Sequence, residues 1–214
     1  MTEDYFEDLK KIVIDSLKAT VRDNESFMPR IHLLKEEEEK VIFLPFGDDE
    51  EKRNILLAVG ALAFEEECHQ MIFISDTYVR KMETPAQAKE VEENWATEQP
   101  STYPDSLRSE AIVMQALDFK EPKNEKLYIM IYKKKDNEII DIDESSMPTE
   151  SVGGAIKGYL SDGFCRAKVI DTLQRKEITI DQLSSTPQPD LYEVLIEISA
   201  EIKKDYPNIR PGVE

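Results

Sequence analysis

Residues 108–143 read RSEAIVMQALDFKEPKNEKLYIMIYKKKDNEIIDID, and this stretch decides the fold. Apolar and polar side chains alternate in three runs, Arg108–Phe119, Lys126–Lys135 and Glu138–Asp143. Alternation with a period of two is typical of strands that bury one face. The two joins, Glu121–Asn124 and Asp136-Asn137, are rich in turn-forming residues. The sequence therefore predicts an antiparallel meander.

Three segments before this meander extend the predicted sheet. Arg30–Lys35 and Lys40–Phe46 are short β-rich runs joined by the acidic turn Glu36–Glu39, and they predict a hairpin. Met71–Val79 is rich in Ile, Phe and Tyr, which favour strands. We therefore expect one mainly antiparallel sheet of about five or six strands.

Two amphipathic segments predict helices that pack on this sheet. Thr2–Val21 carries apolar side chains at three- and four-residue spacing. Asp49–His69 begins with acidic residues, which complement the helix dipole, and its apolar stripe is broad. The expected fold class is α+β, with this long helix packed across the sheet in a domain of residues 1–148.

Beyond a hinge around Pro148, the pattern becomes helical, and we expect a helical C-terminal region over residues 149–214. Its first part predicts a helix over Val152–Leu160 and a second over Asp162–Leu173, capped by Ser161. The run 164–173 also fits a strand, but its three- and four-residue apolar spacing favours the helix.

The last predicted helix, Asp190–Lys204, carries an apolar stripe over three turns. The stripe consists of Leu191, Val194, Leu195, Ile198 and Ile202. An exposed apolar patch of that extent is rare on a monomer. The helix therefore docks on its own sheet or pairs with a second chain. We expect a homodimer in which it contributes to the interface.

The composition excludes several classes of protein. The 214 residues contain 27 Lys and Arg against 45 Asp and Glu, a formal net charge of −18. Phosphate backbones and anionic membranes are bound by clustered cations, so neither is an expected partner. No apolar run reaches the roughly 18 residues of a membrane span, and the N-terminus lacks the pattern of a signal peptide. The widely separated Cys68 and Cys165 suit a reducing compartment, so we expect a cytoplasmic protein.

One cluster suggests a metal site. Glu66 and His69 have the spacing that places a carboxylate and an imidazole on one helix face. A di-iron site needs two such pairs, and the only other histidine, His32, has no matching glutamate. A mononuclear site of Glu66, His69 and Asp76, serving a metal-assisted hydrolase, is the alternative. The simpler interpretation is a polar helix end with His69 at the negative pole of the dipole.

Other catalytic constellations are incomplete in the sequence. Cys68 and His69 are adjacent, so on a helix their side chains point about 100° apart and cannot pair. Both cysteines fall near apolar faces, which suits buried hydrophobic side chains. Lys157 follows a pair of glycines, but no complete phosphate-binding motif surrounds it.

Arginine and aromatic residues gather around the long connection between two predicted strands. They are Arg80, Trp95, Tyr103 and Arg108. If the flanking strands are neighbours, these four residues line the mouth of one groove. Such residues are favoured at recognition surfaces, so the sequence predicts a candidate ligand-binding groove.

The leading functional hypothesis is a non-catalytic binding or assembly protein with no cofactor. Its expected partner is a protein or a second copy of the chain. One alternative is the metal-assisted hydrolase. The other is an acidic inhibitor of a basic or nucleic-acid-binding partner, although the carboxylates concentrate too locally, within Glu36–Glu51, to imitate a DNA backbone.

Overall fold

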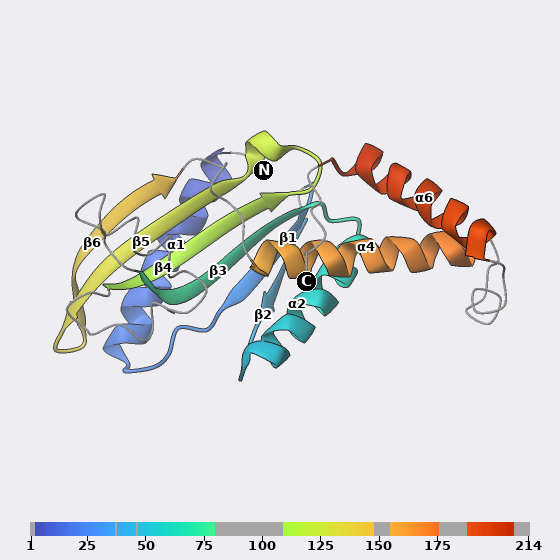
Figure 1. The fold of residues 1–214 in the computed structure, drawn as a ribbon. Helices are drawn as coiled ribbons and strands as arrows, with labels where there is room; N and C mark the ends of the chain where they lie inside the picture. Colours follow the sequence, from blue (N-terminus) through green and yellow to red (C-terminus); the bar gives the residue numbers. More distant parts are fainter. Residues whose placement is uncertain are drawn as a thin grey trace, which may run out of the picture.

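The computed structural model describes residues 3–36, 38–45, 47–79, 109–147, 155–175 and 188–207. These ranges form a six-stranded antiparallel sheet and four α-helices (Figure 1), so the expected α+β class is confirmed. The helices are α1 (Glu3–Arg22), α2 (Asp49–Glu65), α4 (Ala155–Arg175) and α6 (Gln188–Asp205). The strands, with the short 3-10 helix η2 (Pro122–Asn124), are β1 (Arg30–Lys35), β2 (Glu38–Phe43), β3 (Gln70–Val79), β4 (Ser109–Asp118), β5 (Lys126–Lys135) and β6 (Glu138–Met147).

The strand order is β2-β1-β3-β4-β5-β6, and every neighbouring pair is antiparallel. The meander β4-β5-β6 closes with a tight turn at Asp136 and Asn137, whose φ angles are 50° and 62°. Two consecutive positive φ angles are typical of the type I′ turn that matches strand twist. The hairpin β1-β2 turns earlier than expected, because Glu36 at φ 51° reverses the chain and Glu38 already belongs to β2.

Helices cover both faces of the sheet, with α1 behind it in Figure 1. We call the side under α1 the α1 face, and its core combines α1 with β3, β4 and β5. That core includes Phe6, Val13, Ile72, Ile112 and Met130. The opposite face packs against α2 and α4 through residues that include Leu56, Phe73, Leu117, Leu160 and Phe164. None of the described helices has the combination of length and apolarity that crossing a lipid bilayer requires.

The expected helix over Asp49–His69 is wrong at its C-terminal end, because α2 stops at Glu65. Glu67 adopts a left-handed φ of 58°. The Glu67 amide then donates to the Phe64 carbonyl at 3.0 Å, and the Cys68 amide donates to the Ala63 carbonyl at 2.8 Å. This is the Schellman arrangement, usually made with glycine. Glu66 and His69 therefore do not share a helix face.

The C-terminal region begins with one long helix, so the expected break at Ser161 is wrong. Ser161 lies inside α4 and is fully buried, and α4 continues to Arg175. The helical assignment of 164–173 is confirmed. The helix is continuous because it packs closely on α2: a Cβ added to Gly163 would lie 1.9 Å from the Leu57 carbonyl oxygen.

The last helix, α6, lies beside α4 and away from the sheet (Figure 1). Ile198 and Ile202 of the predicted stripe pack with Leu173 of α4, so this part of the stripe is buried within the chain. Tyr206, which follows α6, packs edge-to-face on Phe164 with ring centroids 4.8 Å apart. Part of the C-terminal region thus joins the core around α2 and α4.

Candidate functional site

The structure does not bring the predicted metal ligands together. Glu66 follows α2 and forms an ion pair with Lys40 at 2.5 Å. His69 precedes β3, whereas Asp76 lies seven residues further along that strand, roughly 23 Å away at the usual rise per residue. Among the residues that the structure describes, no three His, Cys, Asp or Glu side chains are grouped as a metal site requires.

The four residues of the predicted groove, Arg80, Trp95, Tyr103 and Arg108, lie outside the described residues. The condition on which that prediction depended is confirmed, because β3 and β4 are neighbours. They pair along their whole length, as far as Val79 opposite Ser109. The connection that carries these four residues therefore leaves and re-enters the sheet at one point.

A hollow lies at this end of the sheet. We call it the Tyr132 hollow and define it by Asp76, Tyr78, Glu110, Tyr132 and Lys134. It comprises two cavities of about 740 and 230 Å³, and both are lined by Glu110, Tyr132 and Lys134. The smaller cavity reaches the C-terminal end of α1 and includes Asp76.

The strand register places these side chains together on the α1 face. Asp76 of β3 is opposite Ile112 of β4, and Glu110 is two residues from Ile112, so the two carboxylates are diagonal neighbours. Diagonal neighbours on one face stand about 7–8 Å apart. Met130 of β5 is also opposite Ile112, which puts Tyr132 beside Glu110. Three strands thus contribute to one polar cluster.

The charges in this cluster are only partly balanced. Lys134 Nζ lies 2.7 Å from Glu110 Oε1, so this carboxylate has a cation. Asp76 has no ion pair with any other described residue. Partial burial raises the pKa of Asp76, and the charge of Glu110 adds to the increase. Among the described residues, no cation pairs with the Asp76 carboxylate, which is exposed to solvent.

Tyr132 is the most buried polar side chain of the hollow, at 9% exposure. No hydrogen bond joins its hydroxyl to another described residue. Burial raises the pKa of Tyr132, and the carboxylates of Glu110 and Asp76 raise it further. The hydroxyl thus remains protonated and open to a partner inside the hollow.

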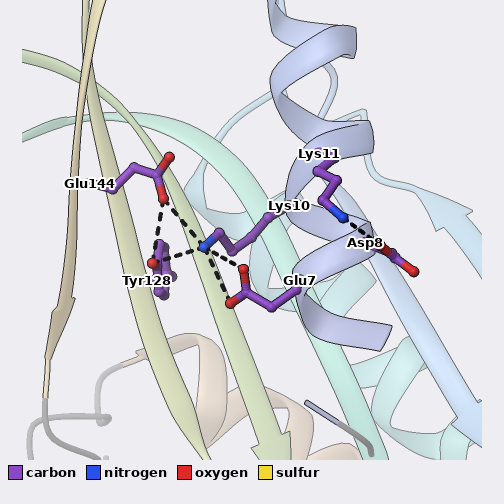
Figure 2. A network of polar contacts seen from close by, with 6 residues as sticks. All are labelled: Glu7, Asp8, Lys10, Lys11, Tyr128 and Glu144. Atoms are coloured by element: carbon purple, nitrogen blue, oxygen red, sulfur yellow. Dashed lines mark hydrogen bonds and ion pairs between the residues drawn. The ribbon is translucent and has the colours of Figure 1, made fainter. Parts of the chain in front are cut away.

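A second polar network lies on the same face of β5 (Figure 2). Lys10 of α1, only 7% exposed, donates to the Tyr128 hydroxyl at 2.8 Å and to Glu7 at 3.0 Å. Its ammonium also lies 3.3 Å from Glu144 of β6 and 4.1 Å from the centre of the Tyr128 ring. Burial lowers the pKa of Lys10, but these hydrogen bonds outweigh burial and raise it. The network fixes α1 to β5 and β6.

A third cluster joins α1 to the hairpin β1-β2. Tyr5 donates to Glu39 at 2.5 Å, and the same carboxylate contacts Nδ1 of His32. His32 is 5% exposed, and its Nε2 is buried without a partner among the described residues. Burial lowers the pKa of His32, although Glu39 opposes this effect. Sequence reasoning missed this cluster because all but the last residue of β1 is buried, so the strand shows no alternation.

The remaining candidate groups are buried or partly buried within the chain. Burial raises the pKa of Cys68 and raises that of Cys165 to about 11, so both thiols stay protonated at neutral pH. Lys157 forms an ion pair with Glu125 at 2.8 Å, and both side chains are more than nine-tenths buried. The Lys157 ammonium is therefore committed to a carboxylate of its own chain.

Sequence reasoning singled out Asp76 but missed Glu110 and Tyr132. Their shared face follows from the period of two in β4 and β5, but their proximity to Asp76 depends on the register with β3. The chain matches no protein-family model, and no similar curated protein or solved structure was found.

Proposed function

We propose that this chain is a non-catalytic binding protein of the cytoplasm, and that it holds its ligand in the Tyr132 hollow. The observation that carries the proposal is a pair of polar groups that form no ion pair or hydrogen bond with another described residue. They are the exposed carboxylate of Asp76 and the hydroxyl of Tyr132, a residue that is 9% exposed. Ligand sites are concave and combine aromatic surface with a few placed polar groups. The hollow is more charged than most such sites, but it supplies the rings of Tyr78 and Tyr132 and the polar groups of Asp76, Glu110 and Lys134.

The chemistry of the other candidate groups supports binding over catalysis. Both thiols are protonated, with Cys68 buried and Cys165 partly buried, so they make poor nucleophiles. The residues of the hydrolase alternative do not converge, because Glu66 follows α2, His69 precedes β3 and Asp76 lies far along that strand. In the hollow, burial and neighbouring carboxylates keep the Tyr132 hydroxyl protonated, which suits a hydrogen-bonding role.

Self-association belongs to the same proposal. Ile196 of α6 is 53% exposed and Ile170 of α4 is 55% exposed, although both helices pack on each other through nearby residues. We infer a homodimer in which α6 contributes to the interface. Sedimentation of the full chain and of Ile196→Asp tests this inference. A wild-type monomer, or a variant that dimerises equally well, would contradict it.

The binding proposal is tested by nuclear magnetic resonance on the 15N-labelled full chain. A panel of small amines, carboxylic acids, sugars and neutral fragments is added, and amide shifts are mapped on β3, β4 and β5. We expect at least one chemical class to shift amides next to Asp76, Glu110 and Tyr132. Tyr132→Phe should abolish these shifts, whereas Tyr159→Phe, which removes a hydroxyl from α4, should preserve them. If no compound of the panel shifts the amides next to the hollow, the proposal is refuted.

A further inference from the structure

In the Lys10 network, a tyrosine and two carboxylates on this face of the sheet bind an ammonium group (Figure 2). The hydroxyl of Tyr128 and the carboxylates of Glu7 and Glu144 surround one ammonium group. The ammonium is almost fully buried, at 7% exposure of its residue, and these acceptors keep it charged. The arrangement is a built ammonium site that α1 fills from its own side chain.

The Tyr132 hollow repeats this set of groups further along the same strand. Tyr132 is four residues beyond Tyr128 on the same face, about 13 Å away at the usual rise of a strand. Its two carboxylates, Asp76 and Glu110, come from β3 and β4 instead of α1 and β6. Each site thus combines a tyrosine hydroxyl with a pair of carboxylates.

The two sites differ in what supplies the cation. The smaller cavity extends past the end of α1, where the helix contributes only Leu17, Thr20 and Val21. Among the described residues that line it, Lys134 is the only cation, against the carboxylates of Glu25, Asp76 and Glu110. Because Lys134 is paired with Glu110, no described residue supplies beside Asp76 the positive charge that Lys10 provides in the first site.

We propose that the Tyr132 hollow binds an organic ammonium group, held between the Asp76 carboxylate and the Tyr132 hydroxyl. This inference rests on the proposed function and names the ligand class of that site. The ammonium donates one hydrogen bond to Asp76 and another to the Tyr132 oxygen, as Lys10 does to Glu7 and Tyr128. The remainder of the ligand extends into the larger cavity of about 740 Å³, which Lys133 and Lys135 also line, so the positive charge of the ligand stays at the Asp76 end.

The geometry favours an ammonium over the other cations. Ca²⁺ and Mg²⁺ take six or more oxygen ligands, and no metal-ligating trio is grouped among the described residues. A guanidinium is best matched by one carboxylate that accepts two parallel hydrogen bonds. A carboxylate and a hydroxyl from different strands instead suit a compact group with three divergent donors.

The test uses the 15N-labelled full chain and two ammonium probes, n-butylammonium and Nα-acetyl-lysine methylamide. The first represents a free amine and the second a lysine side chain of a peptide. Both should shift amides beside Asp76 and Tyr132, and the tighter of the two identifies the source. The neutral counterparts, n-butanol and the Nε-acetylated lysine derivative, should bind at least about tenfold more weakly, because they lack the charge.

Variants separate this site from general attraction to a chain of net charge −18. Asp76→Asn and Tyr132→Phe should each weaken ammonium binding about tenfold or more. Asp15→Asn removes an equal charge from the exposed surface of α1 and should leave binding unchanged. Both hollow variants keep the shape of the side chain, and unchanged amide spectra elsewhere confirm that they fold.

The outcomes distinguish the inference from the function on which it rests. Equal binding of the neutral probes or equal loss in Asp15→Asn would overturn the ammonium assignment. If another class from the fragment panel binds the hollow, the binding function stands and the ligand class is wrong. If nothing binds there, both are refuted.

Discussion

Gly163→Ala should destabilise the protein, although alanine is the better helix former. A Cβ at Gly163 would lie 1.9 Å from the Leu57 carbonyl oxygen, and one at Gly60 would lie 2.1 Å from the carbonyl oxygen of Leu160. Contacts of a Cβ below 3.0 Å are essentially never seen. Because both obstacles are backbone atoms, α2 and α4 must move apart by about 1 Å.

The magnitude follows from the contacts that this separation weakens. Leu56, Leu160 and Phe164 are fully buried in the shared core, and the burial of each contributes about 2 kcal/mol. A gap of roughly 0.5–1 Å forfeits about a quarter to a half of a contact, or about 1.5–3 kcal/mol for the three side chains. Replacing glycine by alanine within a helix stabilises the folded state by about 1 kcal/mol through helix propensity. The expected net loss is about 0.5–2 kcal/mol.

Urea unfolding followed by far-ultraviolet circular dichroism measures this loss in the free energy of unfolding. In thermal unfolding, Tm should fall by roughly 1–8 °C. One displacement relieves both close contacts, so the double variant with Gly60→Ala should lose less than the sum of the single losses. Gly47→Ala is the control, since its Cβ would meet only the side chain of Glu51. A Gly163→Ala protein more stable than the wild type would refute the close helix crossing.

Three further substitutions test other features. Glu67→Gly should raise Tm by about 1–3 °C, because glycine adopts the φ of 58° without strain and the exposed pair with Lys35 contributes little; a lower Tm would contradict this. Asp118→Ala should cost about 2–4 kcal/mol, since this buried carboxylate accepts four hydrogen bonds. Burial raises the pKa of Asp118, but the four hydrogen bonds outweigh burial and lower it below the unfolded value. The ionised carboxylate therefore stabilises the fold fully above about pH 3.9, and this stabilisation is lost as the pH falls through the lower pKa of the folded state. Urea titrations near pH 7 and pH 3 should show the difference shrinking in acid, and a constant difference would argue against an ionised Asp118. Glu125→Gln should cost about 3–5 kcal/mol by leaving the buried Lys157 without its carboxylate, and the double variant with Lys157→Met should recover part of the loss in the same assay.

The meander was predictable because apolar and polar residues alternate along its sequence. The alternation in β4 and β5 places both strands to within one residue of their observed ends. The predicted end of β6 at Asp143 is too early, since the strand continues to Met147. Glu144, Ser145 and Ser146 carry no apolar pattern, and the backbone pairing with β5 alone extends the strand there.

The errors arose where tertiary contacts or an unusual backbone conformation decide the outcome. Glutamate is rarely the residue that ends a helix in the left-handed conformation, so Glu67 gave no signal for the end of α2. Ser161 is a good capping residue, but its burial in α4 depends on the close packing with α2. The candidate site needed the same kind of information, because Asp76 and Glu110 meet only through the register of β3 and β4.

The complete pairing of β3 with β4 has a consequence for how the protein can evolve. Val79 and Ser109 are paired residues, so the 29 residues between them begin and end about 5 Å apart. Because the ends of this connection lie so close together, the sheet does not require it to have a particular length. Its closure entropy costs only about 0.6 kcal/mol more for each doubling of length. Changes in the length of this segment therefore cost little closure entropy. The segment joins the sheet beside the Tyr132 hollow, so its length can change there without altering the register of β3 and β4.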